Sequence, residues 1–202
     1  MAAILPTKGN LMAAKRSRDL AQLGYELMDR KRNILVREIM TLLDTAKDVQ
    51  DQIDTVFTEA YTALQRANIQ LGICDRIAEG VDVDNSVEIR YHSVMGVELP
   101  HIPDHSPPPR PEYGFSATCT ALDDCYIKFH RVKELTRSLA EVETSIYRLA
   151  KSIKKAQKRA NALQNIVIPG LDETIRVITD ALEEKSREEF VRLKVIKQNA
   201  NK

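Results

Sequence analysis

The chain has 202 residues, a formal net charge of +1, no Trp, 5% aromatic residues and 29% charged residues. So few aromatic residues beside so much charge favours an elongated helical protein, whose core is a seam between helices, over a compact globule. The near-zero net charge by itself implies no nucleic-acid or acidic-membrane partner. Three cysteines are too few, and odd in number, for a secreted disulfide framework.

The charge is unevenly distributed along the chain. Residues 1–40 carry a net charge of +4, residues 41–150 carry −8 and residues 151–202 carry +5. The N-terminus lacks an apolar core of signal-peptide length, and no stretch approaches the roughly 18 apolar residues of a membrane-spanning helix. We therefore expect a soluble, cytosolic protein with basic ends, an acidic middle and no direct membrane insertion.

Residues 1–79 are predicted to form an N-terminal helix after a short tail, with Thr7 or Asn10 as its cap. Helical periodicity starts at Leu20, Leu23, Leu27 and Ile34. From Leu35 the apolar residues follow alternating steps of three and four, the heptad pattern of a coiled coil. This seam comprises Leu35, Ile39, Leu42, Ala46, Val49, Ile53, Val56, Ala60, Leu64, Ala67 and Leu71.

Residues 80–117 break the helical pattern. In Val87–Pro100, apolar residues alternate with polar ones on either side of Met95 and Gly96, which predicts a short β-hairpin. The proline-rich run that follows is typical of extended polyproline II, and we interpret it as a semi-rigid connector rather than an SH3-type ligand.

Residues 118–202 are predicted to form a second, C-terminal helix, kinked near Pro169. Its seam also has heptad spacing, so the two helices should fold back as an antiparallel coiled-coil hairpin. The fold class is therefore all-α, with a β-hairpin and proline-rich insertion between two long helices. The second seam comprises Leu122, Tyr126, Phe129, Val132, Leu135, Leu139, Val142, Ile146, Leu149, Ile153, Ala156, Ala160, Leu163 and Val167, and continues through Leu171, Ile175, Ile178, Leu182, Leu193 and Ile196.

Pairing residue 79 with residue 118 makes the numbers of facing residues sum to about 197. Both basic ends then meet at one tip of the hairpin. Gly24 would lie near residue 173, level with Pro169 and Gly170, and these two weak points would allow bending or a close approach.

No catalytic constellation emerges from the sequence, and we expect no cofactor. His101 and His105 share a proline-rich loop, where their spacing has no helical meaning, so a metal site is disfavoured. Cys74 should lie near Cys119 and Cys125 in the folded hairpin, but there is no CxxC motif. Thiols that fill the seam are favoured over a zinc site or a redox disulfide.

The basic tip has three interpretations: solvated helix faces, a nucleic-acid interface, or a partner protein with an acidic socket. Nucleic-acid binding is disfavoured because no aromatic residues are interleaved with the basic ones and acidic residues are mixed among them. The predicted partner contacts on the helices are Arg30, Lys31, Arg32, Lys151, Lys154, Lys155, Lys158 and Arg159.

Four motifs occur in order along the chain: PTKGNL at 6–11, LAQLGYELMDRKRNILVREI at 20–39, SVMGVELP at 93–100 and NIVIPGLDETIRVI at 165–178. Together they resemble the D subunit of V-type/A-type rotary ATPases, which is their central-stalk rotor component, and the resemblance covers essentially the whole chain. The short length and brief C-terminal tail resemble the bacterial and archaeal type.

The resemblance implies a non-catalytic rotor shaft that couples ATP hydrolysis or synthesis to proton or sodium transport. Its terminal helices would enter the ring of A and B subunits, the F subunit would bind alongside, and the C (or d) subunit would join the other end. The hairpin region is linked in the family to stimulation of ATPase activity, so Met95 and Gly96 complete the predicted contacts. The alternatives are a prefoldin-like chaperone and a coiled-coil scaffold.

Overall fold

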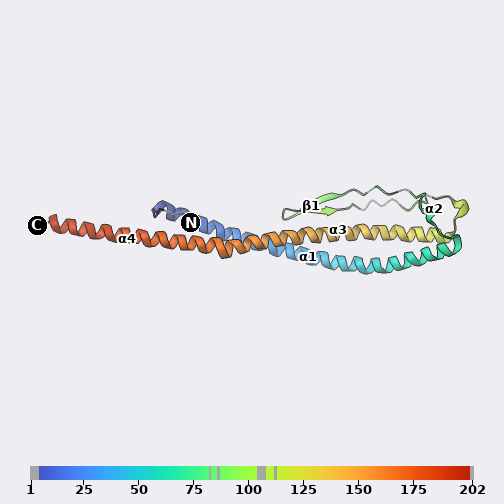
Figure 1. Cartoon of the computed structure of the whole chain (residues 1–202), viewed down its shortest axis with the longest axis horizontal. Helices are drawn as coiled ribbons and strands as arrows, with labels where there is room; N and C mark the ends of the chain where they lie inside the picture. Colours follow the sequence, from blue (N-terminus) through green and yellow to red (C-terminus); the bar gives the residue numbers. More distant parts are fainter. Residues whose placement is uncertain (1–4, 82, 86, 104–107, 112, 201–202) are drawn as a thin grey trace. The chain divides into compact units, whose positions relative to one another are not determined.

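The computed structural model describes residues 5–81, 83–85, 87–103, 108–111 and 113–200. The chain divides into two compact units. Residues 1–34 and 153–202 form the terminal unit, and residues 35–152 form the central unit. Helix α1 (Lys8–Leu71) contributes to both, and in each unit it packs antiparallel to a later helix (Figure 1).

Helix α1 starts with a side-chain cap. The backbone N–H of Asn10 donates a hydrogen bond to Thr7 Oγ1 at 3.2 Å, so Thr7 is the capping residue. The helix ends at Leu71 because Gly72 adopts a positive φ of 81°, a left-handed conformation that ends helices and favours glycine. A single short turn, α2 (Asp75–Ala78), follows where the sequence pattern predicted a continuous helix to residue 79.

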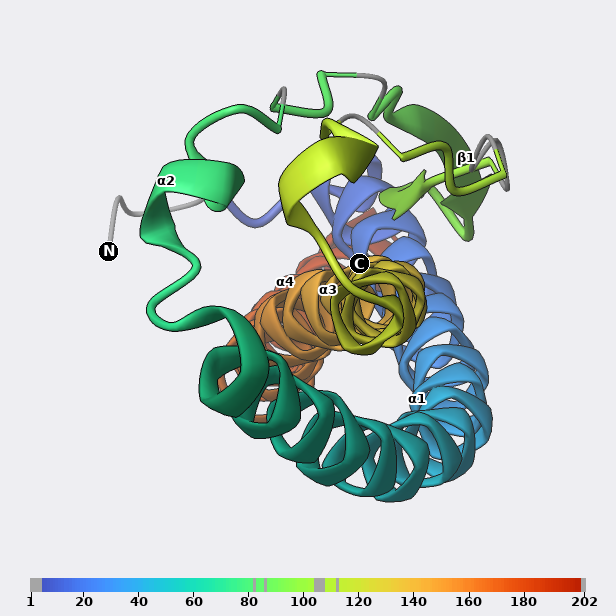
Figure 2. The same cartoon turned by 90° about the vertical axis from the view of Figure 1, so that its right-hand side faces the viewer.

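The insertion of the central unit contains the predicted β-hairpin, formed by β1 (Arg90–Val94) and β2 (Val97–His101). Met95 and Gly96 form its turn with positive φ angles of 51° and 75°, as a two-residue type I′ turn requires. Leu99 is almost fully buried, whereas the five residues of β1 are exposed or half-buried. Figures 1 and 2 show α3 between this hairpin and the central part of α1.

After a 3₁₀ turn (Phe115–Ala117), the second long helix begins as α3 (Thr120–Ala162). It passes through one π-helical segment, η2 (Leu163–Val167), into α4 (Ile168–Ala200). Pro169 therefore lies within the first turn of α4, directly after the π-helical segment. It has no backbone N–H and so cannot donate the hydrogen bond that other helical residues donate. The helix continues across Pro169 and Gly170.

The predicted seam of the central unit is confirmed. On α1 every seam residue from Leu35 to Leu71 is buried or half-buried, and Leu35, Ala60 and Ala67 are fully buried. On α3, Leu149 is fully buried and Val132, Leu135 and Val142 are nearly so. Each large aliphatic side chain buried here contributes roughly 1.5–3 kcal/mol, which makes the seam the core of this unit.

The start of the seam was predicted wrongly for the terminal unit. Leu20, Leu23, Leu27 and Ile34 are 68%, 56%, 62% and 42% exposed. The residues that continue the heptad steps back from Leu35 toward the N-terminus are a mixture of apolar, small and charged residues, and we call them the inner seam. Its members are Leu11, Ala14, Arg18, Ala21, Tyr25, Met28 and Arg32, all half-buried except the half-exposed Arg18.

The pairing of the helices also differs from the prediction. The rings of Tyr61 and Phe129 meet at 5.7 Å in the central unit, and Arg32 contacts Gln157 in the terminal unit. Facing residue numbers therefore sum to about 190 rather than 197. The cause is the early end of α1, which shortens this arm by eight residues.

Gly24 faces a different element from the predicted one. A Cβ atom placed on it would lie 3.6 Å from Leu163 Cδ1, so Gly24 lies beside the π-helical segment and not level with Pro169. Beyond Leu182, residues 183–199 of α4 are exposed, including Leu193 and Ile196 of the predicted seam. None of the helices in the described residues is apolar and long enough to cross a bilayer.

Candidate functional site

The terminal unit is strongly basic. Its residues include 18 Lys and Arg against 10 Asp and Glu, a net charge of +8, whereas the central unit carries 12 against 19, a net charge of −7. Four basic side chains lie close together in sequence near the C-terminal end of α3, and all four are exposed: Lys154, Lys155, Lys158 and Arg159. None of them forms an ion pair with another described residue. This surface is the principal candidate for binding an acidic partner.

The predicted contacts on α1 divide into two kinds. Arg30 is exposed and Lys31 is half-buried. Arg32 is held inside the terminal unit: its Nη1 donates to Gln157 Oε1 at 2.7 Å, and its Nη2 lies 2.7 Å from a carboxylate oxygen of Asp29. Arg32 therefore joins the two helices, a role that the run of three basic residues did not reveal.

A second arginine occupies the inner seam. Arg18 Nε lies 3.2 Å from Asp172 Oδ1, and the two residues form an ion pair whose side chains are both about half exposed. Exposed ion pairs are worth about 0–1 kcal/mol, so this contact fixes register more than it stabilises the fold. Lys151 belongs to the central unit, where its side chain is exposed.

The β-hairpin is attached to α3 by polar contacts that the sequence did not predict. Glu141 accepts two hydrogen bonds, from the backbone N–H of Ile102 at 2.9 Å and across 3.0 Å from His101 Nδ1. Arg148 donates to the carbonyl oxygen of Glu98 at 3.0 Å, and its guanidinium lies 5.3 Å from the ring centre of Tyr91. These contacts involve β1, β2 and the residue that follows β2, and they fix the hairpin against one face of α3.

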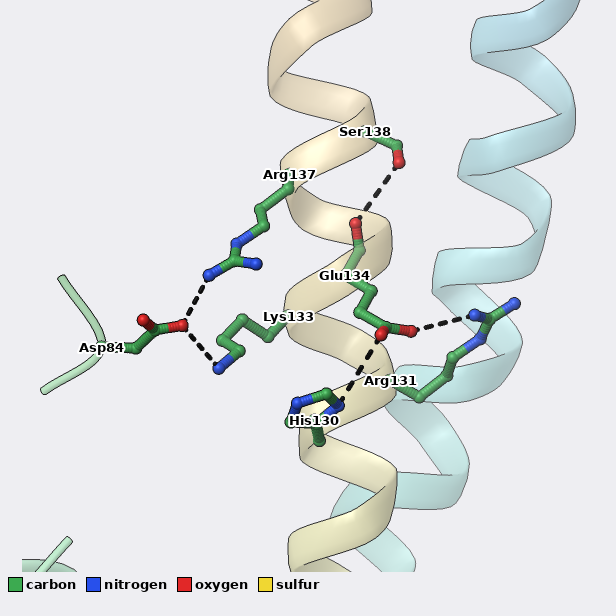
Figure 3. A network of polar contacts seen from close by, with 7 residues as sticks. All are labelled: Asp84, His130, Arg131, Lys133, Glu134, Arg137 and Ser138. Atoms are coloured by element: carbon green, nitrogen blue, oxygen red, sulfur yellow. Dashed lines mark hydrogen bonds and ion pairs between the residues drawn. The ribbon is translucent and has the colours of Figure 1, made fainter. Parts of the chain in front are cut away.

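A third anchor holds the start of the insertion. Asp84 Oδ2 accepts from Lys133 Nζ at 2.9 Å and from Arg137, as Figure 3 shows. Next to this group, Glu134 contacts Arg131 at 3.0 Å. The spacing along α3 is four residues from Arg137 to Glu141 and seven from Glu141 to Arg148, which places the three side chains on one face of the helix. This row of polar residues was a signal in the sequence that another part of the chain covers this face.

A groove of about 590 Å³ lies beside these anchors, between the end of β2 and α3. Its polar lining includes His101, Arg131, Glu134 and Arg137, and its apolar lining includes Leu135 and Val142. The acidic and basic groups along it are largely paired with each other. The groove therefore offers no concentrated charge for a ligand.

The predicted thiol cluster is partly brought together. Cys125 is buried and Cys74 and Cys119 are half-buried, all as free thiols. Burial raises the pKa of the Cys125 thiol, and the neighbouring Cys74 and Asp124 raise it further. Within the described residues, no group of three or more His, Cys, Asp or Glu is placed to hold a metal ion. His105 lies outside the described residues.

Together, these elements define a class of protein: an antiparallel helical hairpin with a small β-hairpin on one side and a basic surface on its terminal unit. The chain matches the family model of the ATP synthase D subunit over residues 10–198. It belongs to this family. The comparisons give no support to the prefoldin-like or scaffold alternatives.

Curated relatives match along nearly the whole chain. The V-type ATP synthase D subunit of Thermotoga neapolitana is 43% identical over 197 residues, which cover 96% of this chain and 97% of the relative. The A-type ATP synthase D subunit of Pyrococcus furiosus is 37% identical, covering 96% and 93%. That of Methanosphaera stadtmanae is 32% identical, covering 97% and 94%.

Proposed function

We propose that this chain is the non-catalytic central rotor shaft of a V-type/A-type ATPase or ATP synthase, coupling ATP chemistry to proton or sodium transport. The observation that carries the proposal is the match to the D-subunit family over almost the entire chain. The antiparallel pairing of long helices supports it, because two helices locked along a seam resist twisting better than a single helix. In this role the protein sits on the cytoplasmic side, peripheral to the membrane.

The partners of the shaft are the other subunits of the complex. The basic surface at Lys154, Lys155, Lys158 and Arg159, with Arg30, Lys31 and Lys151, bears on the ring of A and B subunits, which holds the nucleotide sites. The F subunit binds alongside the helices, and the C (or d) subunit joins the shaft to the membrane side. Exposed lysine and arginine side chains suit a rotating contact, because each exposed ion pair is worth only about 0–1 kcal/mol.

The experiment reconstitutes the complete complex and compares two double charge reversals. Lys155→Glu with Lys158→Glu removes positive charge from the basic surface, and the control pair Lys47→Glu with Arg66→Glu makes the same change at exposed positions of the central unit. We expect ATPase activity and single-molecule rotation to fall roughly tenfold in the first pair and to stay near wild type in the second. Equal activity in both pairs would contradict the ring contact, and a complex that assembles and rotates without this chain would overturn the proposed function.

The tip of the β-hairpin forms a second contact in this proposal. Met95 is 45% exposed and sits with Gly96 at the end of a hairpin that Glu141 and Arg148 hold in place. Deleting residues 88–99 should leave the helical hairpin folded while changing the ATPase activity or assembly of the complex. Loss of helicity in circular dichroism would show instead that the insertion is part of the helical core.

A further inference from the structure

The second long helix has one residue more than its heptad pattern requires, and the extra residue lies in η2. Up to Leu163 the buried row of this helix follows steps of three and four. Continuing those steps predicts Val167 and Val177 on the seam, but these residues are 40% and 61% exposed. The next residue in each case is better covered, since Ile168 is half-buried and Ile178 is fully buried. Beyond η2 the row has therefore moved by one residue, and it comprises Ile168, Leu171, Ile175, Ile178 and Leu182.

Two polar contacts on either side of η2 give the same excess independently. Arg32 donates to Gln157 on one side, and Arg18 pairs with Asp172 on the other. On α1 these contacts are fourteen residues apart, which is two heptads, and the inner seam between them keeps its steps of three and four. On the facing helix they are fifteen residues apart. The facing helix therefore absorbs one residue between Gln157 and Asp172.

The backbone of η2 is where that residue is absorbed. The N–H of Ile168 donates to the carbonyl oxygen of Leu163, five residues earlier instead of the four of an α-helix. A π turn takes up one residue more than an α turn, so the apolar row resumes on the side that faces α1. Pro169 follows directly. In a continuous α-helix its ring would clash with the carbonyl four residues before it, so the proline and the wider turn favour each other.

We propose that η2 is a joint in the shaft: it stores one residue in excess of the heptads, Pro169 fixes it at this position, and the paired helices of the terminal unit twist and open most readily there. An insertion into a heptad pattern locally unwinds a coiled coil, and π turns are common sites of bending. The contacts of Arg18 and Arg32 hold the two helices together on either side of the joint. Only the mechanical role of this joint rests on the proposed function.

The first experiment removes the stored residue while keeping the seam. Ile166 is 71% exposed, and its deletion in the Pro169→Ala background leaves a row that continues in steps of three and four through an ordinary α-helix. The melting temperature of the full chain, followed by circular dichroism, should equal or exceed that of Pro169→Ala alone. A deletion within a paired helix otherwise turns every following side chain away from the seam, so a tolerated deletion is specific to a stored residue.

The matched control deletes Glu143, an exposed residue of α3, in the same Pro169→Ala background. Even with η2 closed to compensate, the row between the deletion and η2 leaves the seam, including the fully buried Leu149. The melting temperature should therefore fall by about 10 °C or more. An equal fall for the deletion of Ile166 would overturn the proposal.

The part played by Pro169 is tested by deleting Ile166 with the proline retained. The proline ring then lies inside a continuous α-helix, so the melting temperature should be roughly 5–10 °C lower than in the same deletion with Pro169→Ala. In the undeleted chain Pro169→Ala should have a smaller effect, because η2 already accommodates the ring. Equal effects of Pro169→Ala in the two chains would show that the proline does not fix η2, and would overturn the proposal.

The joint itself is tested by comparing the wild type with the Ile166 deletion in the Pro169→Ala background. Hydrogen exchange of the Ile168 amide should be roughly tenfold or more slower in the variant. In the reconstituted complex, the angular fluctuations of the shaft during pauses in rotation should narrow. An unchanged exchange rate or unchanged fluctuations would overturn the proposal, and normal rotation in that case would leave the proposed function standing. A complex that assembles and rotates without this chain would overturn the proposed function instead.

Discussion

The central and terminal units use the same helix α1 in different ways. In the central unit α1 buries leucine, isoleucine and alanine residues against α3, and α3 also holds the insertion on another face through Glu141 and Arg148. In the terminal unit the inner seam of α1 is at most half-buried, and Leu20, Leu23 and Leu27 are exposed. The two units also differ in net charge, because the central unit is acidic and the terminal unit is basic.

This difference indicates a division of labour between fold and assembly. In the central unit, α1 and the insertion pack against two faces of α3 (Figures 1 and 2). The terminal unit keeps apolar side chains and positive charge on its surface, which is expected of a segment that completes its packing against other proteins. Stability and binding should therefore respond to different residues in the two units.

The largest expected effect comes from the core of the central unit. Leu149→Ala removes a fully buried side chain and should lower the free energy of unfolding by about 2–5 kcal/mol, since the cavity adds to the lost burial. Leu27→Ala in the terminal unit is the matched change at an exposed site and should alter it by less than about 0.5 kcal/mol. Urea denaturation followed by circular dichroism measures both. Similar losses at the two positions would remove the distinction between the units.

A second effect concerns the attachment of the β-hairpin. Glu141→Ala removes the acceptor of the Ile102 N–H and the partner of His101 at once, which should weaken the attachment by about 1–2 kcal/mol. Hydrogen exchange of the Ile102 amide should then accelerate roughly tenfold, because about 1.4 kcal/mol corresponds to a factor of ten. Glu143→Ala, at an exposed position two residues away, is the control and should leave this exchange rate unchanged. An unaltered rate in the Glu141 variant would show that the burial of Leu99 and the Arg148 hydrogen bond are sufficient to hold the hairpin.

Periodicity was sufficient to predict the helical hairpin and the β-hairpin. The seam from Leu35 to Leu71 keeps steps of three and four almost without interruption, so its buried side could be predicted from the spacing alone. The alternation around Met95 and Gly96 likewise predicted the turn, because the pattern reverses there and glycine accepts the positive φ.

The terminal unit could not be predicted in the same way because two heptad patterns run along one helix. Hydrophobicity favours Leu20, Leu23 and Leu27, but the partner helix contacts the other pattern, where Arg18 meets Asp172 and Arg32 meets Gln157. Small residues allow helices to approach closely, a criterion that a scale of hydrophobicity does not contain. The anchors Glu141 and Arg148 were missed for a related reason: their partners are backbone groups of a hairpin whose position no local pattern specifies.

A smaller effect tests the close approach at Gly24. The nearest atom to a new Cβ is Leu163 Cδ1 at 3.6 Å, an ordinary van der Waals distance, so Gly24→Ala should fit. Alanine is favoured over glycine within a helix, and the variant should therefore be more stable by about 0.5–1 kcal/mol. Gly24→Leu should instead lose about 1–3 kcal/mol, because its larger side chain must displace Leu163. Thermal unfolding of both variants gives the comparison, and a destabilising alanine would show that the inner seam is tighter than this distance implies.

The smallest expected effect is a dependence of stability on alkaline pH in the central unit. The pKa of Cys125 is raised above its usual value of 9.0, chiefly by burial. The neutral thiol is therefore favoured in the folded state, and the stability linked to it is fully present below the pKa of the unfolded chain. That stability is lost as pH rises, because the unfolded chain releases its proton first, with a slope of at most about 1.4 kcal/mol per pH unit for one group.

Tyr113 should contribute in the same direction, because burial and its 2.7 Å hydrogen bond to the Asp123 carboxylate raise the pKa of its hydroxyl. Free energies of unfolding at about pH 8 and about pH 10 should therefore differ less in Cys125→Ala than in the wild type. Cys119→Ala, at a half-buried site, is the control and should keep the wild-type slope. The comparison uses the change with pH within each variant, so any cavity left by the substitution cancels. A slope unchanged in the Cys125 variant but reduced in Tyr113→Phe would assign the effect to the tyrosine alone.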